Sequence, residues 1–254
     1  MEASSVALRK AEEARIRIFV DSITTKFEGK LAVLRSPLCV GVLGLTEPTS
    51  AFIVRRIEEI ARKAKAVVPK KRCDINFLVW VTPNAHQIVR KATDIRSAVF
   101  DGMQVGDLNR LAKSPGPVWS WSGTQIVDAF TQVGLPLFSL GASNASASSR
   151  IQTAIRYDIS AAIVVIDAAA VVGKTPTQIA DYAAVRALAR AVVPRMATSI
   201  PTILTLFDAN SAAPLELSDV DRALLRGVYL TDGRRDADAD RSLIARTIIK
   251  DVLP

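Results

Sequence analysis

Residues 159–191 constrain the fold most, because a strongly apolar run is followed there by a clear helix start. Residues 161–166 read AAIVVI, which is long enough for a buried strand and too short to span a membrane. Thr175 can then cap a helix, Pro176 lacks only an N–H that has no partner in a first turn, and Gln178 can complete a capping box. A buried strand that leads into a helix predicts an α/β layer.

Apolar strands and amphipathic helices alternate through the rest of the chain. Further strands are expected at residues 38–45, 75–81 and 118–125, and residues 201–207 are either a strand or a turn of buried chain. Helices are expected at residues 5–27, 46–64 and 238–252, near 107–112, and after the capping residues Thr82 and Ser218. The pattern predicts an α/β (α+β) fold in which a mixed sheet is layered with amphipathic helices.

Length and composition allow one large domain. The chain has 254 residues, of which 49% are hydrophobic, enough for a sizeable core. We expect a single domain over residues 1–254, with two subdomains, 1–140 and 150–254, as the alternative. The small polar stretch at 141–149, GASNASASS, would then be a mobile loop or a hinge between the halves.

The formal charge of +8 favours acidic partners without identifying any. Lysines and arginines are scattered, acidic residues interrupt several of their runs, and no nucleic-acid recognition motif accompanies them. We therefore expect no nucleic-acid partner. No apolar run is long enough for a transmembrane segment either.

The two cysteines and the single histidine limit metal and redox chemistry. Cys39 and Cys73 each lie beside an expected strand, and they form either a disulfide between neighbouring strands or two buried thiols. One histidine and two distant cysteines cannot build a closed zinc site, so no metal or other cofactor is expected. The histidine, His86, is either a surface side chain or the base of a serine- or cysteine-dependent hydrolase.

Trp119 and Trp121 share one face of the strand expected at 118–125, because side chains alternate along a strand. They form either a ligand-stacking pair or part of a hydrophobic sheet face. Both roles place the two rings on the same side of the sheet.

The chain contains PLCVGVLGL, INFLVWVTPNA, AAIVVIDAAAVVGKTPTQIADYAAVRALA, and TILTLF followed by ELSDVDRALLRGVY. These stretches resemble a family of uncharacterised exported proteins from alphaproteobacteria. The last stretch fits the pattern L-S-x-x-D-R-x-x-L-R-x-x-Y, with Leu217, Ser218, Asp221, Arg222, Leu225, Arg226 and Tyr229. This pattern is similar to a later helix of zinc metallopeptidases of the zincin type.

The catalytic H-E-x-x-H motif of zincins is not kept in this chain. On the resemblance, its first histidine, glutamate and second histidine become Tyr182, Ala183 and Arg186, which provide no metal ligand and no general base. The resemblance implies a non-catalytic exported binding or structural protein with a degenerate metallopeptidase-like domain. Its partner would be an unknown protein or a cell-envelope component, and a hydrolase centred on His86 is the alternative.

The resemblance also implies a location and a candidate binding surface. The protein would be periplasmic or secreted, with its signal absent from this sequence, or cytoplasmic if Met1 is native. Tyr182 and Arg186 lie four residues apart and therefore share a helix face, where they could bind an anion in a former peptide cleft. The alternative places Tyr182 in the core and Arg186 at a solvated edge.

The resemblance to exported proteins favours the disulfide between Cys39 and Cys73 over free thiols. We expect thiol titration of the denatured, unreduced protein to find no free thiol. The bond would close a loop of about 35 residues and contribute roughly 3 to 4 kcal/mol to stability in the chain-entropy model. Two titratable thiols per chain would contradict this prediction.

Overall fold

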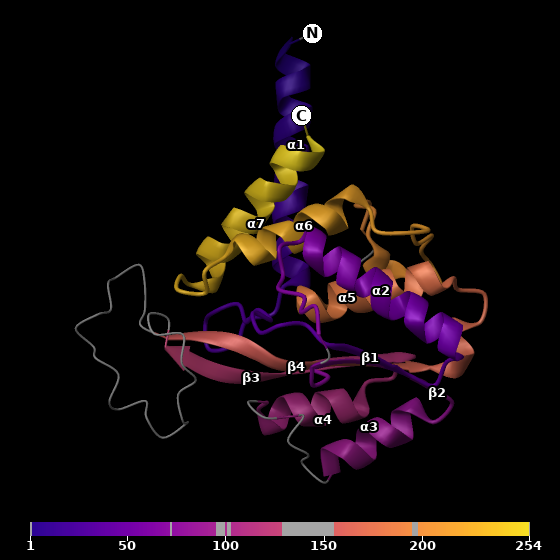
Figure 1. The fold of residues 1–254 in the computed structure, drawn as a ribbon. Helices are drawn as coiled ribbons and strands as arrows, with labels where there is room; N and C mark the ends of the chain where they lie inside the picture. Colours follow the sequence, from indigo (N-terminus) through magenta and orange to yellow (C-terminus); the bar gives the residue numbers. More distant parts are fainter. Residues whose placement is uncertain are drawn as a thin grey trace.

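A four-stranded mixed sheet lies between two layers of helices (Figure 1). The computed structural model describes residues 2–71, 73–94, 100, 103–128, 155–194 and 198–253. The strands are β1 (Val40–Leu43), β2 (Phe77–Thr82), β3 (Val118–Asp128) and β4 (Ile155–Asp167). The predicted α/β class is confirmed.

Helices cover both faces of the sheet within the described residues. One face carries α1 (Glu2–Ile23), α2 (Glu47–Lys63), α5 (Pro176–Leu188), α6 (Asp219–Leu230) and α7 (Ala237–Val252). The other face carries α3 (Ala85–Asp94) and α4 (Val105–Lys113). Short 3-10 turns occur at Ala168–Val171 and Ile203–Thr205, so residues 201–207 form a turn of buried chain and not a strand.

Two helix starts were readable from their capping residues. Thr175 and Gln178 form the expected capping box of α5. Ser218 and Asp221 form the capping box of α6. In both helices these side chains satisfy backbone N–H groups that a first turn leaves without partners.

The largest differences from the predicted boundaries are at the end of α1 and the start of β4. α1 ends at Ile23, earlier than predicted, because Thr24 forms a β-bridge with Ala191. β4 begins at Ile155, well before the predicted start at residue 161, because the polar first part of the strand also pairs with β3. In both cases a tertiary contact overrides the local pattern.

The strands lie in the order β1-β2-β4-β3. β1, β2 and β4 are parallel, and β3 is antiparallel to β4. The strands that follow Cys39 and Cys73 are therefore neighbours, as predicted. β4 comes from the second half of the chain and lies between strands of the first half, so the two predicted halves share one sheet. Residues 141–149 lie outside the described residues, and their role as a hinge stays a prediction.

The sheet separates two hydrophobic cores. The main core lies between the sheet and the layer of α1, α2, α5, α6 and α7 (Figure 1). The second core lies against α3 and α4 and contains Trp119 and Trp121, which are both buried. Trp121 stacks on Phe100 with ring centroids 5.1 Å apart. The tryptophan pair therefore belongs to a hydrophobic sheet face, which was one of its two predicted roles.

A β-bulge interrupts β4 near its middle. Gly123 of β3 pairs with Ala161, whereas Thr124 pairs with Ile159, so Ser160 is an extra residue in the ladder. An extra residue changes the face to which the following side chains point, because side chains alternate along a strand.

The bulge reverses the alternation of β4. Ile163 and Val165 after the bulge belong to the second core, whereas Tyr157 and Ile159 before it belong to the main core. The even-numbered side chains of the first part of β4 consequently turn away from the main core. Arginine and aspartate side chains occupy these positions, at 156 and 158.

Cys39 and Cys73 form the predicted disulfide, with their Cα atoms 6.0 Å apart. Cys39 directly precedes β1, and Cys73 lies shortly before β2. The bond therefore ties together the amino ends of two parallel neighbours and closes the loop that contains α2. A loop of this length corresponds to about 3 to 4 kcal/mol in the chain-entropy model.

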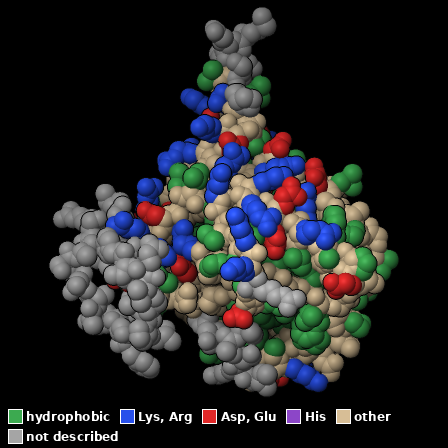
Figure 2. All heavy atoms as spheres, in the orientation of Figure 1, with side chains coloured by type: hydrophobic (Ala, Val, Ile, Leu, Met, Phe, Trp, Pro, Cys, Tyr) green, Lys and Arg blue, Asp and Glu red, His purple; other side chains and the backbone are tan. Residues whose placement is uncertain are grey.

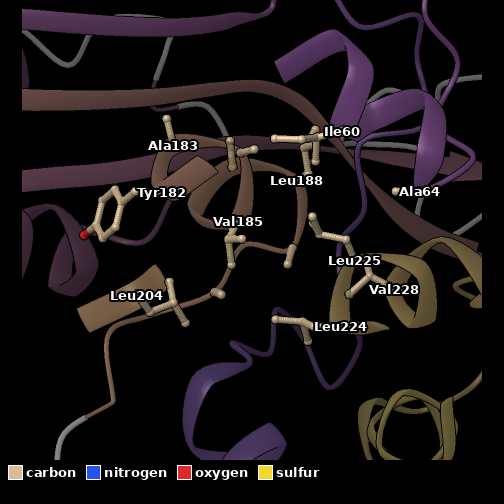
Figure 3. Close-up of a cluster of buried hydrophobic side chains, with 14 of the residues drawn as sticks. Ile60, Ala64, Tyr182, Ala183, Val185, Leu188, Leu204, Leu224, Leu225 and Val228 are labelled. Carbon is tan, nitrogen blue, oxygen red and sulfur yellow. The ribbon is translucent and has the colours of Figure 1, made fainter. Parts of the chain in front are cut away.

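Nearly every side chain of α5 is buried, including that of Asp181. Figure 3 shows Val185 and Leu188 of α5 on the side of the apolar side chains of α2 and α6, whereas Tyr182 lies on the side of Leu204. The Asp181 carboxylate accepts hydrogen bonds from Arg56 Nε at 2.8 Å, Arg56 Nη2 at 3.0 Å and the Leu217 backbone N–H at 2.7 Å. This buried ion pair links α2, α5 and the chain that enters α6.

Gly44, which follows β1, provides a test of the packing between β1 and β2. Its φ is +83°, and a Cβ atom there would lie 1.7 Å from the carbonyl oxygen of Val81. Gly173 has a similar φ of +76°, and a Cβ atom there would meet no other atom within 4 Å, so it is a matched control. Gly173→Ala should cost roughly 1 to 2 kcal/mol for the left-handed conformation. Gly44→Ala should cost about 1 to 3 kcal/mol more because the strands must separate.

Urea unfolding of the two variants measures this difference. Equal losses of unfolding free energy for Gly44→Ala and Gly173→Ala would contradict the close approach of Gly44 to Val81.

Candidate functional site

A cavity of about 430 Å³ lies beside the amino end of β4. It is bounded by the chain after α2, the segment before β1 and the turn between α6 and α7. Four basic side chains line it, together with one acidic side chain, Asp232; the basic ones are Arg35, Lys65, Arg156 and Arg234. We call it the basic cavity.

Asp158 fixes two of the guanidinium groups. Arg156 donates from Nε and Nη2 to the two carboxylate oxygens at 2.9 and 3.0 Å, and Arg35 Nε lies 3.6 Å from Oδ1. Arg35 also donates from Nη2 to the carbonyl oxygen of Thr231 at 2.7 Å. No described residue accepts a hydrogen bond from Nη1 of Arg35 or Arg156. Each guanidinium is thus held in place and keeps donors for another acceptor.

Burial raises the electrostatic free energy of this arrangement. Arg156 and Asp158 are both buried. Burial lowers the pKa of Arg35, and the nearby Asp158 carboxylate opposes that effect. A single carboxylate is shared by two guanidinium groups, so positive charge remains in a place that water reaches poorly.

The Tyr229 hydroxyl is a second polar group without a partner at this cavity. Tyr229 lines the basic cavity, and its buried hydroxyl makes no hydrogen bond to any described residue. Burial raises the pKa of Tyr229, against the lowering effect of Arg35, so the phenol keeps its proton at neutral pH. A buried hydroxyl without a partner costs roughly 1 to 3 kcal/mol. It offers a donor to a ligand that enters the cavity.

Buried charges also lie behind the turn between α6 and α7. Lys30 donates from Nζ to the carbonyl oxygens of Gly233 and Arg235, both at 3.1 Å. Asp240 is fully buried, and neither of its carboxylate oxygens has a hydrogen-bond partner among the described residues. Burial, together with the negative charge of Asp232, raises the pKa of Asp240 to about 6.

Tyr182 and Arg186 share a helix face, as their spacing predicted. Arg186 donates from Nη1 to the Tyr182 hydroxyl at 2.6 Å, and its guanidinium carbon lies 5.6 Å from the centre of the ring. Tyr182 is buried against Phe207, with ring centroids 4.8 Å apart, and Arg186 is half-buried. Neither residue lines the basic cavity. Their role in binding stays a prediction.

His86 lies on the opposite side of the sheet, at the start of α3. It is exposed, and its Nε2 lies 3.0 Å from the carbonyl oxygen of Ala112. Ser114 and Asp167 line the same open hollow of about 540 Å³. The Asp167 carboxylate accepts a hydrogen bond from the backbone N–H of Ala169 at 2.9 Å. Within the described residues His86 bonds to neither a hydroxyl nor a carboxylate, so no nucleophile and base are assembled there.

Sequence reasoning missed the basic cavity. Its residues come from the segment before β1, the chain after α2, the start of β4 and the turn after α6, which are far apart in the chain. Two weak signals pointed to it. Arg156 and Asp158 alternate with apolar residues at the start of β4, and Tyr229 ends the zincin-like pattern.

Comparison of the chain with protein-family models, with curated proteins and with solved structures finds no match. The resemblance to exported and zincin-type proteins therefore stays a prediction. In the described part of the chain, no group of three or more His, Cys, Asp and Glu side chains is placed to hold a metal ion. No helix within the described ranges combines the length and the apolar character that a membrane crossing needs.

Asp240 should make stability depend on pH. Its folded-state pKa of about 6 lies above the ordinary value of 3.8, so the folded protein holds this proton more tightly than the unfolded chain. The resulting stability is complete below about pH 4 and is lost as the pH rises through 6. Between pH 4 and pH 8, Asp240→Asn should therefore gain roughly 2 to 3 kcal/mol of unfolding free energy relative to the unmodified protein.

Asp238→Asn is a matched control on the exposed side of α7. Its hydrogen bond and charge interaction with Lys26 lower the pKa of Asp238, so its contribution to stability is lost as the pH falls. That loss occurs below about pH 4, so Asp238→Asn should show no pH-dependent change in urea unfolding between pH 4 and pH 8, in contrast to Asp240→Asn. An effect of Asp240→Asn that does not change with pH would contradict the shifted pKa.

Proposed function

We propose that this protein is a non-catalytic binding protein and that the basic cavity takes its ligand, an anion. The observation that carries the proposal is the meeting of Arg35, Arg156 and the Tyr229 hydroxyl in one cavity with hydrogen-bond donors to spare. Natural folds leave few buried polar groups without a partner, and those that remain often mark a functional site. A fixed fork of guanidinium donors suits carboxylates and phosphates.

The surface supports an anionic ligand. Lys and Arg side chains are frequent on the upper part of the face in Figure 2, with Asp and Glu among them. The net charge of +8 would draw anions towards this protein. Lys65, an exposed residue of the cavity wall, adds a charge at the entrance.

A periplasmic or secreted location is part of the proposal. The disulfide between Cys39 and Cys73 is compatible with an oxidising compartment outside the cytoplasm. The resemblance to exported proteins points the same way, and the partner would be a molecule of the cell envelope or of the surroundings. The hydrolase centred on His86 remains the alternative that the sequence left open, although His86, which shares a hollow with Ser114 and Asp167, bonds to neither of them.

The proposal is tested by thermal shift. The melting temperature is measured with citrate, sulfate and phosphate and compared with its value in neutral and cationic solutes of similar size. At least one anion should raise the melting temperature, and the shift should shrink at high salt. Lys65→Gln should weaken the binding of that anion several-fold, because the change removes one positive charge and keeps a side chain of similar length. Lys10→Gln, on the exposed part of α1, should have no effect. A protein that no anion stabilises would overturn the proposal.

A further inference from the structure

We infer that the ligand of the basic cavity is an organic phosphomonoester, held by Arg35, Arg156 and the Tyr229 hydroxyl. This inference rests on the proposed anion-binding function and narrows it to one chemical class. Its grounds are the charge of the cavity wall, the three separate parts of the fold that supply the donors, and the volume of the cavity.

The charge of the wall suits a dianion. Asp158 is the single carboxylate within ion-pair distance of Arg35 and Arg156 among the described residues, so the pair keeps one positive charge. Lys65 at the rim and Arg234 each add one positive charge, and Asp232 offsets one of them, so the lining keeps an excess of two. A phosphomonoester carries a charge of about −1.5 to −2 at neutral pH and would match this excess.

The donors come from three separate parts of the fold. Arg35 lies before β1, Arg156 lies on β4, and Tyr229 lies near the end of α6. A tetrahedral phosphate presents three terminal oxygens in different directions, so three such donors can each find an acceptor. A carboxylate has two oxygens in one plane and suits a single guanidinium fork better.

The cavity has room for more than the phosphate itself. Its volume of about 430 Å³ falls within the range of small-molecule sites. Ala66 and Val67 also line the cavity and form an apolar part of its wall. An organic group attached to the phosphate would lie against this part.

Isothermal titration with four probes separates these features at pH 7.5. Phenyl phosphate is tetrahedral and dianionic, phenyl sulfate is tetrahedral with one charge, and isophthalate carries two charges on planar groups. Inorganic phosphate lacks the organic group. We expect phenyl phosphate to bind at least about tenfold more tightly than each of the others, which corresponds to one additional charge-assisted hydrogen bond.

Tyr229→Phe tests the position of the phosphate. The change should weaken the binding of phenyl phosphate about tenfold, because one hydrogen-bond donor to a charged acceptor is lost. The same change should preserve or raise the melting temperature of the ligand-free protein, because it removes a buried hydroxyl that has no partner. Tyr157→Phe is the matched control, since Tyr157 points from β4 into the main core. It should leave the affinity unchanged.

Vesicles distinguish a lipid from a soluble source of the phosphomonoester. Binding to phosphatidylcholine vesicles that contain phosphatidic acid, and not to phosphatidylcholine alone, would indicate a lipid headgroup. Binding of phenyl phosphate without vesicle binding would indicate a soluble ligand.

The outcomes separate the two proposals. If phenyl sulfate or isophthalate binds as tightly as phenyl phosphate, the inference is overturned and the anion-binding function stands. If inorganic phosphate binds equally well, the organic part of the inference is wrong. Unchanged affinity in Tyr229→Phe would remove the assigned site. Binding of none of the anions would overturn the proposed function itself.

Discussion

The ion pair between Arg56 and Asp181 is the interaction on which the helix layer depends. α5 is buried on nearly all sides, and a carboxylate in its middle would be too costly without compensation. Arg56 supplies the opposite charge from α2, and the Leu217 backbone N–H supplies a further donor before α6. One carboxylate therefore links three elements, whose apolar side chains also pack together (Figure 3).

Buried polar groups are treated differently in two parts of the molecule. Asp221, which caps α6, is fully buried and accepts hydrogen bonds from Thr202 Oγ1 at 2.6 Å and the Ile203 N–H at 2.8 Å. Near the turn between α6 and α7, the Tyr229 hydroxyl and the Asp240 carboxylate have no such partners among the described residues. The hydrogen bonds of Asp221 stabilise the scaffold. The unpartnered groups Tyr229 and Asp240 lower the stability of the fold, as polar groups kept for a ligand would.

Local chemistry made much of the fold predictable, and tertiary contacts account for the rest. The capping box of Thr175 and the apolar run at 161–166 are local signals, and the helix and the strand that they predicted are both present. The spacing of Tyr182 and Arg186 correctly placed them on one face, but spacing does not reveal what that face meets. Arg35 and Tyr229 line the basic cavity together although they are far apart in the chain. No local sequence pattern could therefore predict the cavity.

The extra residue at Ser160 decides which side chains form the wall of the basic cavity and which form the core. A strand has two faces, and one inserted residue exchanges them for everything on one side of the insertion. The same strand can thus be fully apolar where helices cover it and carry a buried ion pair where it meets the cavity. A chain one residue shorter at this point would exchange the two faces, so that Tyr157 would point towards the basic cavity and Arg156 towards the main core.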